Sequence, residues 1–304
     1  MDKMRQGVVL FITLSVIAAM LAIVGVLYTY LGKSKQSAAY TQALIQSNLL
    51  FRDSKVIISD LLKQSAKDKE MRKTLLDMLY LAPITLQEEE GDHYATLTCQ
   101  PLDNGVNINW LGLEGNATME SHYTVAQDLF DAIVEQNDIA NPTLLLEKIR
   151  EAIDPHRYPP QNPQGREEQK KGIISLLQFQ DIIREYRFES DDMGKEPIAW
   201  EEYFSFGRDA LYIEGNYISA KLIAQLFDLE LSLVQAEWSI GDDLKQFVTN
   251  QGADISQYDA KIFAKEPQER MQCRVTYGYQ EDSYTFAFKY LEERAVEFEF
   301  FGKE

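Results

Sequence analysis

The chain begins with a short charged segment, MDKMRQG at residues 1–7, which runs directly into VVLFITLSVIAAMLAIVGVLYTYL at residues 8–31. The second segment contains no charged residue. As a helix it is about 36 Å long at ~1.5 Å per residue, enough to cross a hydrocarbon core of roughly 30 Å. A secretory signal peptide has a shorter apolar run and ends in small residues, whereas this run ends in Tyr28, Tyr30 and Leu31. We therefore expect a membrane-spanning helix at residues 8–31.

The basic residues around this helix do not decide its orientation, because Lys3 and Arg5 precede it and Lys33 and Lys35 follow it. The leader at residues 1–7 carries no domain of its own. We therefore expect a single-pass inner-membrane protein whose N-terminus lies inside and whose C-terminal domain is periplasmic.

Composition describes a folded and strongly acidic protein. The chain of 304 residues is 45% hydrophobic and 11% aromatic, which is typical of a globular domain. Its net charge of -18 argues against binding to nucleic acid, because phosphate backbones repel an acidic surface. The sequence contains no HExxH metal motif, no phosphate-binding glycine loop and no GxSxG elbow. We expect no enzymatic activity, and we expect His93, His122 and His156 to be surface or loop residues.

A long helical stalk is predicted after the membrane segment. Residues 33–82 contain neither glycine nor proline, and Leu44, Phe51 and Ile58 recur at helical spacing on one seam. We expect the membrane helix to continue to about residue 62, with a further helical piece through residue 79.

Alternating apolar and polar residues predict strands on both sides of a helical region. Residues 94–99 and 106–111 flank the turn Asp103-Asn104-Gly105, which favours a hairpin. Residues 271–277, 284–290 and 296–300 alternate more strongly and predict three further strands. Each strand has one apolar face, as an antiparallel sheet covered by a helix on one side requires.

The region between these sheet segments is expected to be entirely helical. Breakers such as Asn141-Pro142 and Asp154-Pro155 separate the helical patterns. Helices are predicted at residues 125–135, 143–153, 173–186, 200–211, 218–226 and 232–248. The fold class is therefore α+β, with a long N-terminal helix packed on an antiparallel sheet and a large all-helical insertion. The predicted parts are a leader at 1–7, a membrane helix at 8–31, the stalk and first sheet segment at 32–118, the insertion at 119–250 and the C-terminal strands at 251–304.

The two cysteines, Cys99 and Cys273, both lie in predicted strands of one sheet. In an oxidising compartment they could form a disulfide, and the alternative is two buried thiols, because the sequence alone does not show their geometry.

Two acidic clusters are candidates for calcium, which binds several converging oxygens. The first is Glu189, Asp191 and Asp192 before Gly194, for which the alternative is a solvated loop. The second is Asp242 and Asp243, for which the alternative is a helix N-cap.

The start of the chain resembles the prepilin signal of type IV pilins and type II secretion pseudopilins. In that resemblance a prepilin peptidase cuts between Gly7 and Val8, so the fifth residue of the mature chain is Ile12. Most family members carry a glutamate there, which costs about 2.5–3.5 kcal/mol inside a bilayer unless it is paired. The minor pseudopilin that typically lacks this glutamate and carries a large helical insertion is the K-type subunit of type II secretion. Residues 213–219, IEGNYIS, resemble a segment of that family through Ile213 and Asn216.

The resemblance implies a mechanical role at the tip of a periplasmic pseudopilus, where the subunit would start assembly with I- and J-type minor pseudopilins. Leu44, Phe51 and Ile58 would then pack partly on the protein's own sheet and partly on partner helices. The resemblance also implies calcium in the globular part as a possible cofactor. Two alternatives stay open: an uncleaved, membrane-tethered periplasmic binding or sensing domain, and a minor subunit of a type IV pilus.

Overall fold

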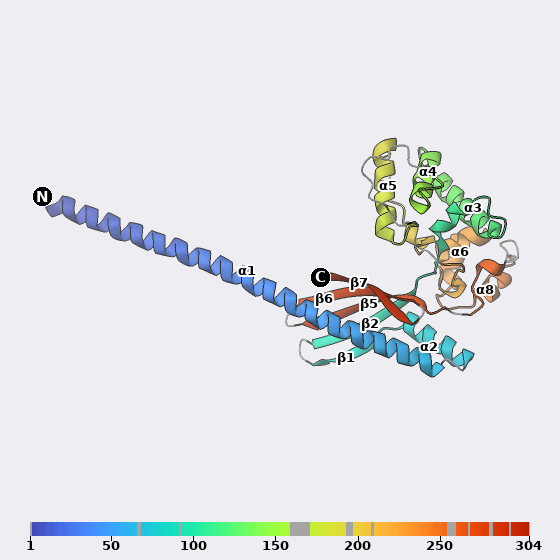
Figure 1. Ribbon diagram of the computed structural model, residues 1–304, viewed down its shortest axis with the longest axis horizontal. Coiled ribbons are helices and arrows are strands. Elements are labelled where there is room, and N and C mark those ends of the chain that lie inside the picture. Colours follow the sequence, from blue (N-terminus) through green and yellow to red (C-terminus); the bar gives the residue numbers. More distant parts are fainter. Residues whose placement is uncertain are drawn as a thin grey trace.

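The computed structural model describes residues 2–65, 68–90, 93–158, 171–192, 197–207, 210–253, 260–266, 268–279, 282–291 and 293–303. Figure 1 shows three parts: a very long N-terminal helix, a sheet that lies against its second half, and a helical body beyond the far end of the sheet. The N-terminal half of the long helix projects away from the rest of the molecule.

The long helix α1 (Asp2–Ser65) is continuous over 64 residues. The absence of glycine and proline after Gly32 explains why no break separates the membrane half from the stalk. A second helix, α2 (Lys69–Leu81), begins at Asp68, whose side chain caps the amides of Glu70 and Met71. The predicted helix ends near residues 62 and 79 are confirmed to within a few residues.

The sheet has the strand order β1-β2-β5-β6-β7, and all neighbouring strands are antiparallel. Its strands are β1 (Ile84–Glu90), β2 (His93–Pro101), β5 (Arg270–Tyr279), β6 (Asp282–Leu291) and β7 (Arg294–Lys303). The three predicted C-terminal strands are confirmed. Strands β2 and β5 are neighbours although more than 160 residues separate them, so the chain between them forms one insertion into the sheet.

The predicted hairpin around Asp103-Asn104-Gly105 is wrong. Strand β2 pairs instead with β1. Strand β1 was not predicted, because the acidic run at residues 88–90 lacks the alternation of apolar and polar residues. The chain leaves the sheet at Asp103, which is buried in an ion pair with Arg270. Gly105 then passes so close to β4 (Phe204–Ser205) that a Cβ would lie 2.8 Å from the backbone there. The predicted strand 106–111 becomes the short β3 (Val106–Asn107), parallel to β4, and a 3-10 turn η1 (Ile108–Gly112).

The helical body has its own hydrophobic core, separate from the core between α1 and the sheet. Its described elements after η1 are α3 (Glu120–Gln136), α4 (Pro142–Ile153), α5 (Leu176–Ser190), η2 (Trp200–Glu202), β4, η3 (Gly215–Tyr217), α6 (Ala220–Phe227), α7 (Leu231–Glu237), α8 (Leu244–Asn250) and η5 (Ala260–Ile262). The core includes Val106 at one end and Phe263 at the other. It therefore extends beyond the predicted insertion bounds of 119 and 250.

Two predicted helices of the insertion are wrong. Residues 200–207 form η2 and β4 with an irregular end, because Phe204 and Ser205 pair with β3 and Trp200 packs among buried aromatic rings. The predicted helix at 232–248 is divided into α7 and α8. Tertiary contacts cause this division: the Trp238 indole donates to the Ile218 carbonyl at 3.1 Å, and Gly241, at φ 101°, donates to the Asn216 carbonyl at 2.7 Å.

The structure joins Cys99 of β2 to Cys273 of β5 in a disulfide, the first of the two states that the sequence left open. The two residues face each other directly in the strand register. The disulfide closes a loop with a sequence separation of 174, which contains the whole helical body. The two strands that flank the insertion are thus covalently tied next to the point where the chain leaves the sheet.

We expect the double substitution Cys99→Ala and Cys273→Ala to lower the free energy of unfolding of the sheet by about 2–5 kcal/mol, because a long loop is no longer closed in the unfolded chain. Hydrogen exchange of the full chain measures this effect as faster exchange in residues 93–101 and 270–279. Reduction of the unsubstituted protein should reproduce the change. Unchanged exchange in both experiments would show that the disulfide contributes nothing to the sheet.

Candidate functional site

The stalk half of α1 presents one face to the sheet. Its buried residues recur every three or four positions: Ala43, Ser47, Leu50, Ser54 and Ile58. The two serines are small and use their hydroxyls within the helix, where Ser54 donates to the Leu50 carbonyl at 2.7 Å and Ser47 to the Leu44 carbonyl at 2.8 Å. This face therefore approaches the sheet closely without leaving an unpaired polar group.

The opposite face of the same helix carries exposed apolar residues. Ile45, Leu49 and Val56 retain 58%, 47% and 56% of their accessible surface. Their spacing of four and seven residues places them on one line along the helix, which we call the outer stripe. Five helical turns are 18 residues, so Leu27 and Leu31 of the membrane half lie in line with Ile45 and Leu49. Both are exposed, and the outer stripe thus continues from the stalk into the membrane half.

The seam named from the sequence faces mainly the protein's own sheet. Ile58 is fully buried, and the Phe51 ring lies 5.1 Å from both the Phe288 and Phe298 rings. Leu44 is half-buried. The exposed apolar residues of the outer stripe are thus different from this seam, and they were not predicted although their spacing is visible in the sequence.

The first half of α1 has the properties of a membrane span. The described helix from Leu14 has a mean hydropathy of 2.2 in its most apolar window, and none of that window is buried. Gly7, Val8 and Ile12 lie within α1, but their side chains are outside the described part.

The calcium candidates do not converge on a common point. Glu189 pairs with the buried Lys148 at 2.7 Å. Asp191 ends α5 in a left-handed conformation, and Asp192 accepts from the Tyr186 hydroxyl at 3.3 Å. Asp243 caps α8, as the alternative reading expected, and Asp242 accepts from the Ser239 amide at 3.1 Å. Within the described ranges no three His, Cys, Asp or Glu residues are grouped so that they could hold a metal ion, and calcium at these residues stays a prediction.

The histidines differ in position. His122, expected at the surface or in a loop, is buried in α3, where its Nε2 lies 2.9 Å from the Leu211 carbonyl oxygen and its ring packs against Trp110. His156 is exposed after α4. The side chain of His93 is outside the described part.

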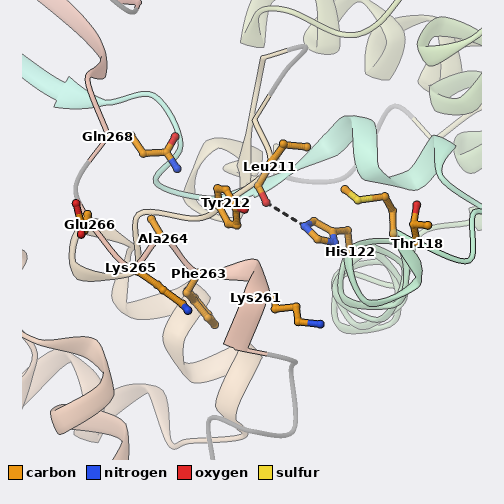
Figure 2. Close-up of a pocket in the computed structure, with 11 residues that line it drawn as sticks. Thr118, His122, Leu211, Tyr212, Lys261, Phe263, Ala264, Lys265, Glu266 and Gln268 are labelled. Carbon is orange, nitrogen blue, oxygen red and sulfur yellow. Dashed lines mark hydrogen bonds between the residues drawn. The ribbon is translucent and has the colours of Figure 1, made fainter.

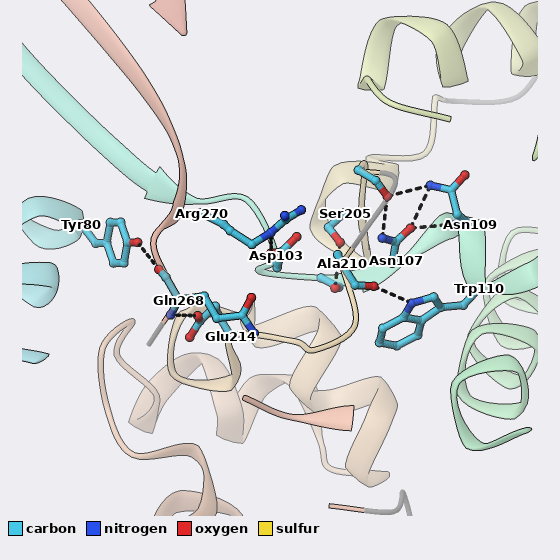
Figure 3. A network of polar contacts seen from close by, with 12 residues as sticks. Tyr80, Asp103, Asn107, Asn109, Trp110, Ser205, Ala210, Glu214, Gln268 and Arg270 are labelled. Atoms are coloured by element: carbon cyan, nitrogen blue, oxygen red, sulfur yellow. Dashed lines mark hydrogen bonds and ion pairs between the residues drawn. The ribbon is translucent and has the colours of Figure 1, made fainter. Parts of the chain in front are cut away.

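A buried polar network joins the helical body to the sheet (Figure 3). The Arg270 Nε donates to Asp103 at 2.7 Å where β2 ends, and the Glu214 carboxylate accepts from the Gln268 amide at 2.5 Å. The Tyr80 hydroxyl of α2 donates to the Gln268 carbonyl at 3.2 Å. These contacts fix the orientation of the helical body relative to the sheet and α2, and therefore relative to the outer stripe.

The two carboxylates of this network have raised pKa values. Burial raises the pKa of Glu214, which is only 5% exposed, to about 7, and the negative charge of Asp103 adds to the rise. Burial also raises the pKa of Asp103, although the guanidinium of Arg270 opposes this rise. The folded protein therefore holds a proton on Glu214 more tightly than the unfolded chain does.

We expect Phe51→Ala to lower the free energy of unfolding by about 2–4 kcal/mol, because its ring contacts two rings of the sheet. Leu49→Ala should change it by less than about 0.5 kcal/mol, because its side chain faces away from the sheet. Thermal unfolding of the full chain, followed by circular dichroism, compares the two variants. Equal destabilisation by both would show that Leu49 packs within the protein.

We expect stability to fall as the pH rises from about 4.5 to about 7, because the stabilising protonation of Glu214 is fully present below its unfolded pKa and is lost through its folded pKa. Glu214→Gln should reduce this fall in the free energy of unfolding by on the order of 2 kcal/mol, because glutamine does not titrate. Glutamine still offers an acceptor to the backbone amide of Gln268, so the hydrogen bond is kept. Urea unfolding followed by tryptophan fluorescence reports the helical body, whose core contains all 3 tryptophans. The exposed Glu147→Gln should keep the unsubstituted profile, and an unaltered profile in Glu214→Gln would contradict the assignment.

Comparison with known proteins gives a match in fold. No family model and no curated protein matches the sequence. Among solved structures, the chain is similar to a chain in the crystal structure of the GspK-GspI-GspJ complex from the type 2 secretion system of enterotoxigenic Escherichia coli. The similarity covers 86% of this chain and 98% of that chain, with a TM-score of 0.52 and 14% identity. The expected α+β architecture, with a long N-terminal helix packed on an antiparallel sheet and a helical insertion, is confirmed, and the chain shares its fold with a chain of this complex.

Proposed function

We propose that the protein is a minor pseudopilin of a type 2 secretion system that assembles side by side with I- and J-type minor pseudopilins. The outer stripe carries this proposal, because Ile45, Leu49 and Val56 are exposed apolar residues on a line that continues the membrane-spanning half. A helix with one face on its own sheet and an apolar opposite face suits packing between its own domain and a second helix. The solved structure of similar fold is a complex of GspK with GspI and GspJ, which agrees with partners of this kind.

The position of the helical body supports a place at the tip of the pseudopilus. This body lies beyond the sheet, at the end of the molecule far from the N-terminus (Figure 1). Subunits that share one membrane and pack their helices in parallel would stack along that direction. A body of this size would obstruct a subunit placed ahead of it, so assembly would start with this chain.

The N-terminal half supports attachment to the inner membrane with the C-terminal domain in the periplasm. The disulfide between Cys99 and Cys273 suits an oxidising compartment such as the periplasm. The proposal includes cleavage by a prepilin peptidase between Gly7 and Val8. Ile12 suits a tip position, because an unpaired glutamate in the bilayer costs about 2.5–3.5 kcal/mol and a subunit with none ahead of it offers no partner.

We expect the full chain, co-expressed with a prepilin peptidase and I- and J-type minor pseudopilins, to lose residues 1–7 and to purify with both partners. The Gly7→Ala variant should not be cleaved and should therefore keep Met1. The double variant Ile45→Asp and Leu49→Asp should be cleaved normally but bind its partners at least about 10-fold more weakly, because it places unpaired charges in an apolar interface. Mass spectrometry of the purified complex measures cleavage and composition together.

Asn48→Asp is the matched control, because it adds a negative charge next to Leu49 but off the outer stripe. It should leave the complex intact. A chain that keeps residues 1–7 and purifies alone would contradict the proposal and favour the membrane-tethered binding domain. A cleaved chain that assembles only with type IV pilus subunits would place it in that other system.

A further inference from the structure

Polar contacts join the helical body to the sheet and α2 at one place. The body and the sheet have separate hydrophobic cores, and the chain passes between them twice, after β2 and before β5. Gln268, just before β5, is held from two sides (Figure 3). Its amide donates to the Glu214 carboxylate of the body at 2.5 Å, and its carbonyl accepts from the Tyr80 hydroxyl of α2 at 3.2 Å. Gln268 is therefore the point where the body, the linker before β5 and α2 meet.

Glu214 is a buried acidic group with no cation beside it. At this junction Asp103 is paired with Arg270 at 2.7 Å, and Glu269 is paired with Arg72 at 2.6 Å. Within the described part of the chain no lysine or arginine forms such a pair with Glu214. Its backbone amide donates to the Asp103 carbonyl at 2.7 Å, which places the two acidic residues next to each other. An ionised Glu214 is thus a buried charge near a second carboxylate, with no cation to compensate it.

The other titratable groups that face Glu214 come from α2 and η3. The Tyr80 and Tyr217 rings lie 5.0 Å apart, and the Tyr217 hydroxyl donates to the Asp77 carboxylate. Burial raises the pKa of both tyrosines, so they stay protonated at neutral pH. Burial and the charge of Asp103 raise the pKa of Glu214 to about 7. Glu214 is therefore a group whose charge changes near neutral pH.

A cavity of about 590 Å³ lies against the same linker (Figure 2). Ala264, Glu266 and Gln268 of the linker form one wall, and Leu211, Tyr212 and the start of α3 form the others. A close-packed surrounding would resist movement of the linker, whereas a cavity leaves space beside it. The linker can therefore shift without first displacing the core of the helical body.

The sheet itself is held closed next to the junction. The disulfide joins β2 to β5, and the Asp103–Arg270 pair lies on the sheet side, between the ends of these two strands. The contacts that a movement of the body must break are mainly hydrogen bonds: Glu214 to Gln268 and to Asp103, Tyr80 to Gln268, Tyr217 to Asp77 and Lys289 to Ile174. The body can thus move as a unit while the strands stay paired.

We propose that Glu214 makes this junction a pH-dependent hinge, which holds the helical body against α2 and the sheet while Glu214 is protonated and lets the body pivot away when Glu214 ionises. Ionisation favours the open form because the carboxylate then reaches water and moves away from Asp103. The body lies at the end of the molecule far from the N-terminus (Figure 1), so the pivot changes its direction relative to the stalk. The inference does not depend on the role of the outer stripe.

Hydrogen exchange of the full chain in lipid nanodiscs tests whether the junction opens locally. Between about pH 5 and about pH 8, the protection factors of the Glu214 and Gln268 amides, corrected for intrinsic exchange, should fall at least about 10-fold. Amides inside α3 and β6 should keep their protection, because neither core opens. Glu214→Gln should abolish the fall, since glutamine does not titrate. Glu147→Gln removes an exposed carboxylate of the same body and should leave the fall unaltered.

Distances between spin labels test whether the body changes direction. Lys55→Cys on the stalk and Thr143→Cys on α4 provide two exposed labelling sites, and the native cysteines are joined in the disulfide. Double electron–electron resonance should give a narrow distance distribution at about pH 5 and a broader one at about pH 8, and Glu214→Gln should stay narrow at both. Protection that falls equally in α3 and β6, distances that do not change with pH, or changes that persist in Glu214→Gln would overturn the proposal.

Discussion

The close packing of the stalk helix on the sheet is the constraint on which the rest of the structure depends. Ala43, Ser47 and Ser54 are small, so the helix backbone approaches the sheet closely, and the Tyr277 hydroxyl of β5 donates to the Ala43 carbonyl at 2.5 Å. Rotation of the helix about its axis would bring larger side chains into this contact and break that hydrogen bond. The sheet therefore determines which side of α1 faces outward, and the outer stripe is the consequence.

Because α1 is one unbroken helix, the sheet also fixes the rotation of its N-terminal half about the helix axis. A continuous helix keeps residues 18 positions apart on the same line, so the contact of Ala43 with the sheet also orients Leu27 and Leu31. A glycine-rich or proline-containing hinge between the two halves would release that relation. The stalk between residues 33 and 65 contains neither residue, so the outer stripe keeps a fixed orientation relative to Leu27 and Leu31.

Local patterns in the sequence predicted the parts of the fold that depend on neighbouring residues. The uncharged run at 8–31 and the alternation in β5 to β7 are such patterns. The hairpin at Asp103 could not be predicted correctly, because Asp103 is directed by an ion pair with Arg270 from a distant part of the chain. The division between α7 and α8 likewise follows from the Trp238 contact with Ile218. The seam of Leu44, Phe51 and Ile58 and the outer stripe both have helical spacing, so the sequence alone does not show which of the two faces the sheet. The aromatic contacts of Phe51 with β6 and β7 decide it.

Contacts with the same sheet also fix the orientation of the helical body. It begins and ends at β2 and β5, which are adjacent strands, and the Leu102 amide donates to the Arg270 carbonyl at 3.0 Å at the point of departure. The buried Asp103–Arg270 pair and the Glu214–Gln268 contact hold the two segments that connect the helical body to the sheet. Loss of one partner of such a buried pair leaves an uncompensated charge, so bending at this junction is costly. A subunit bound through its outer stripe therefore carries its helical body in a defined direction beyond the sheet.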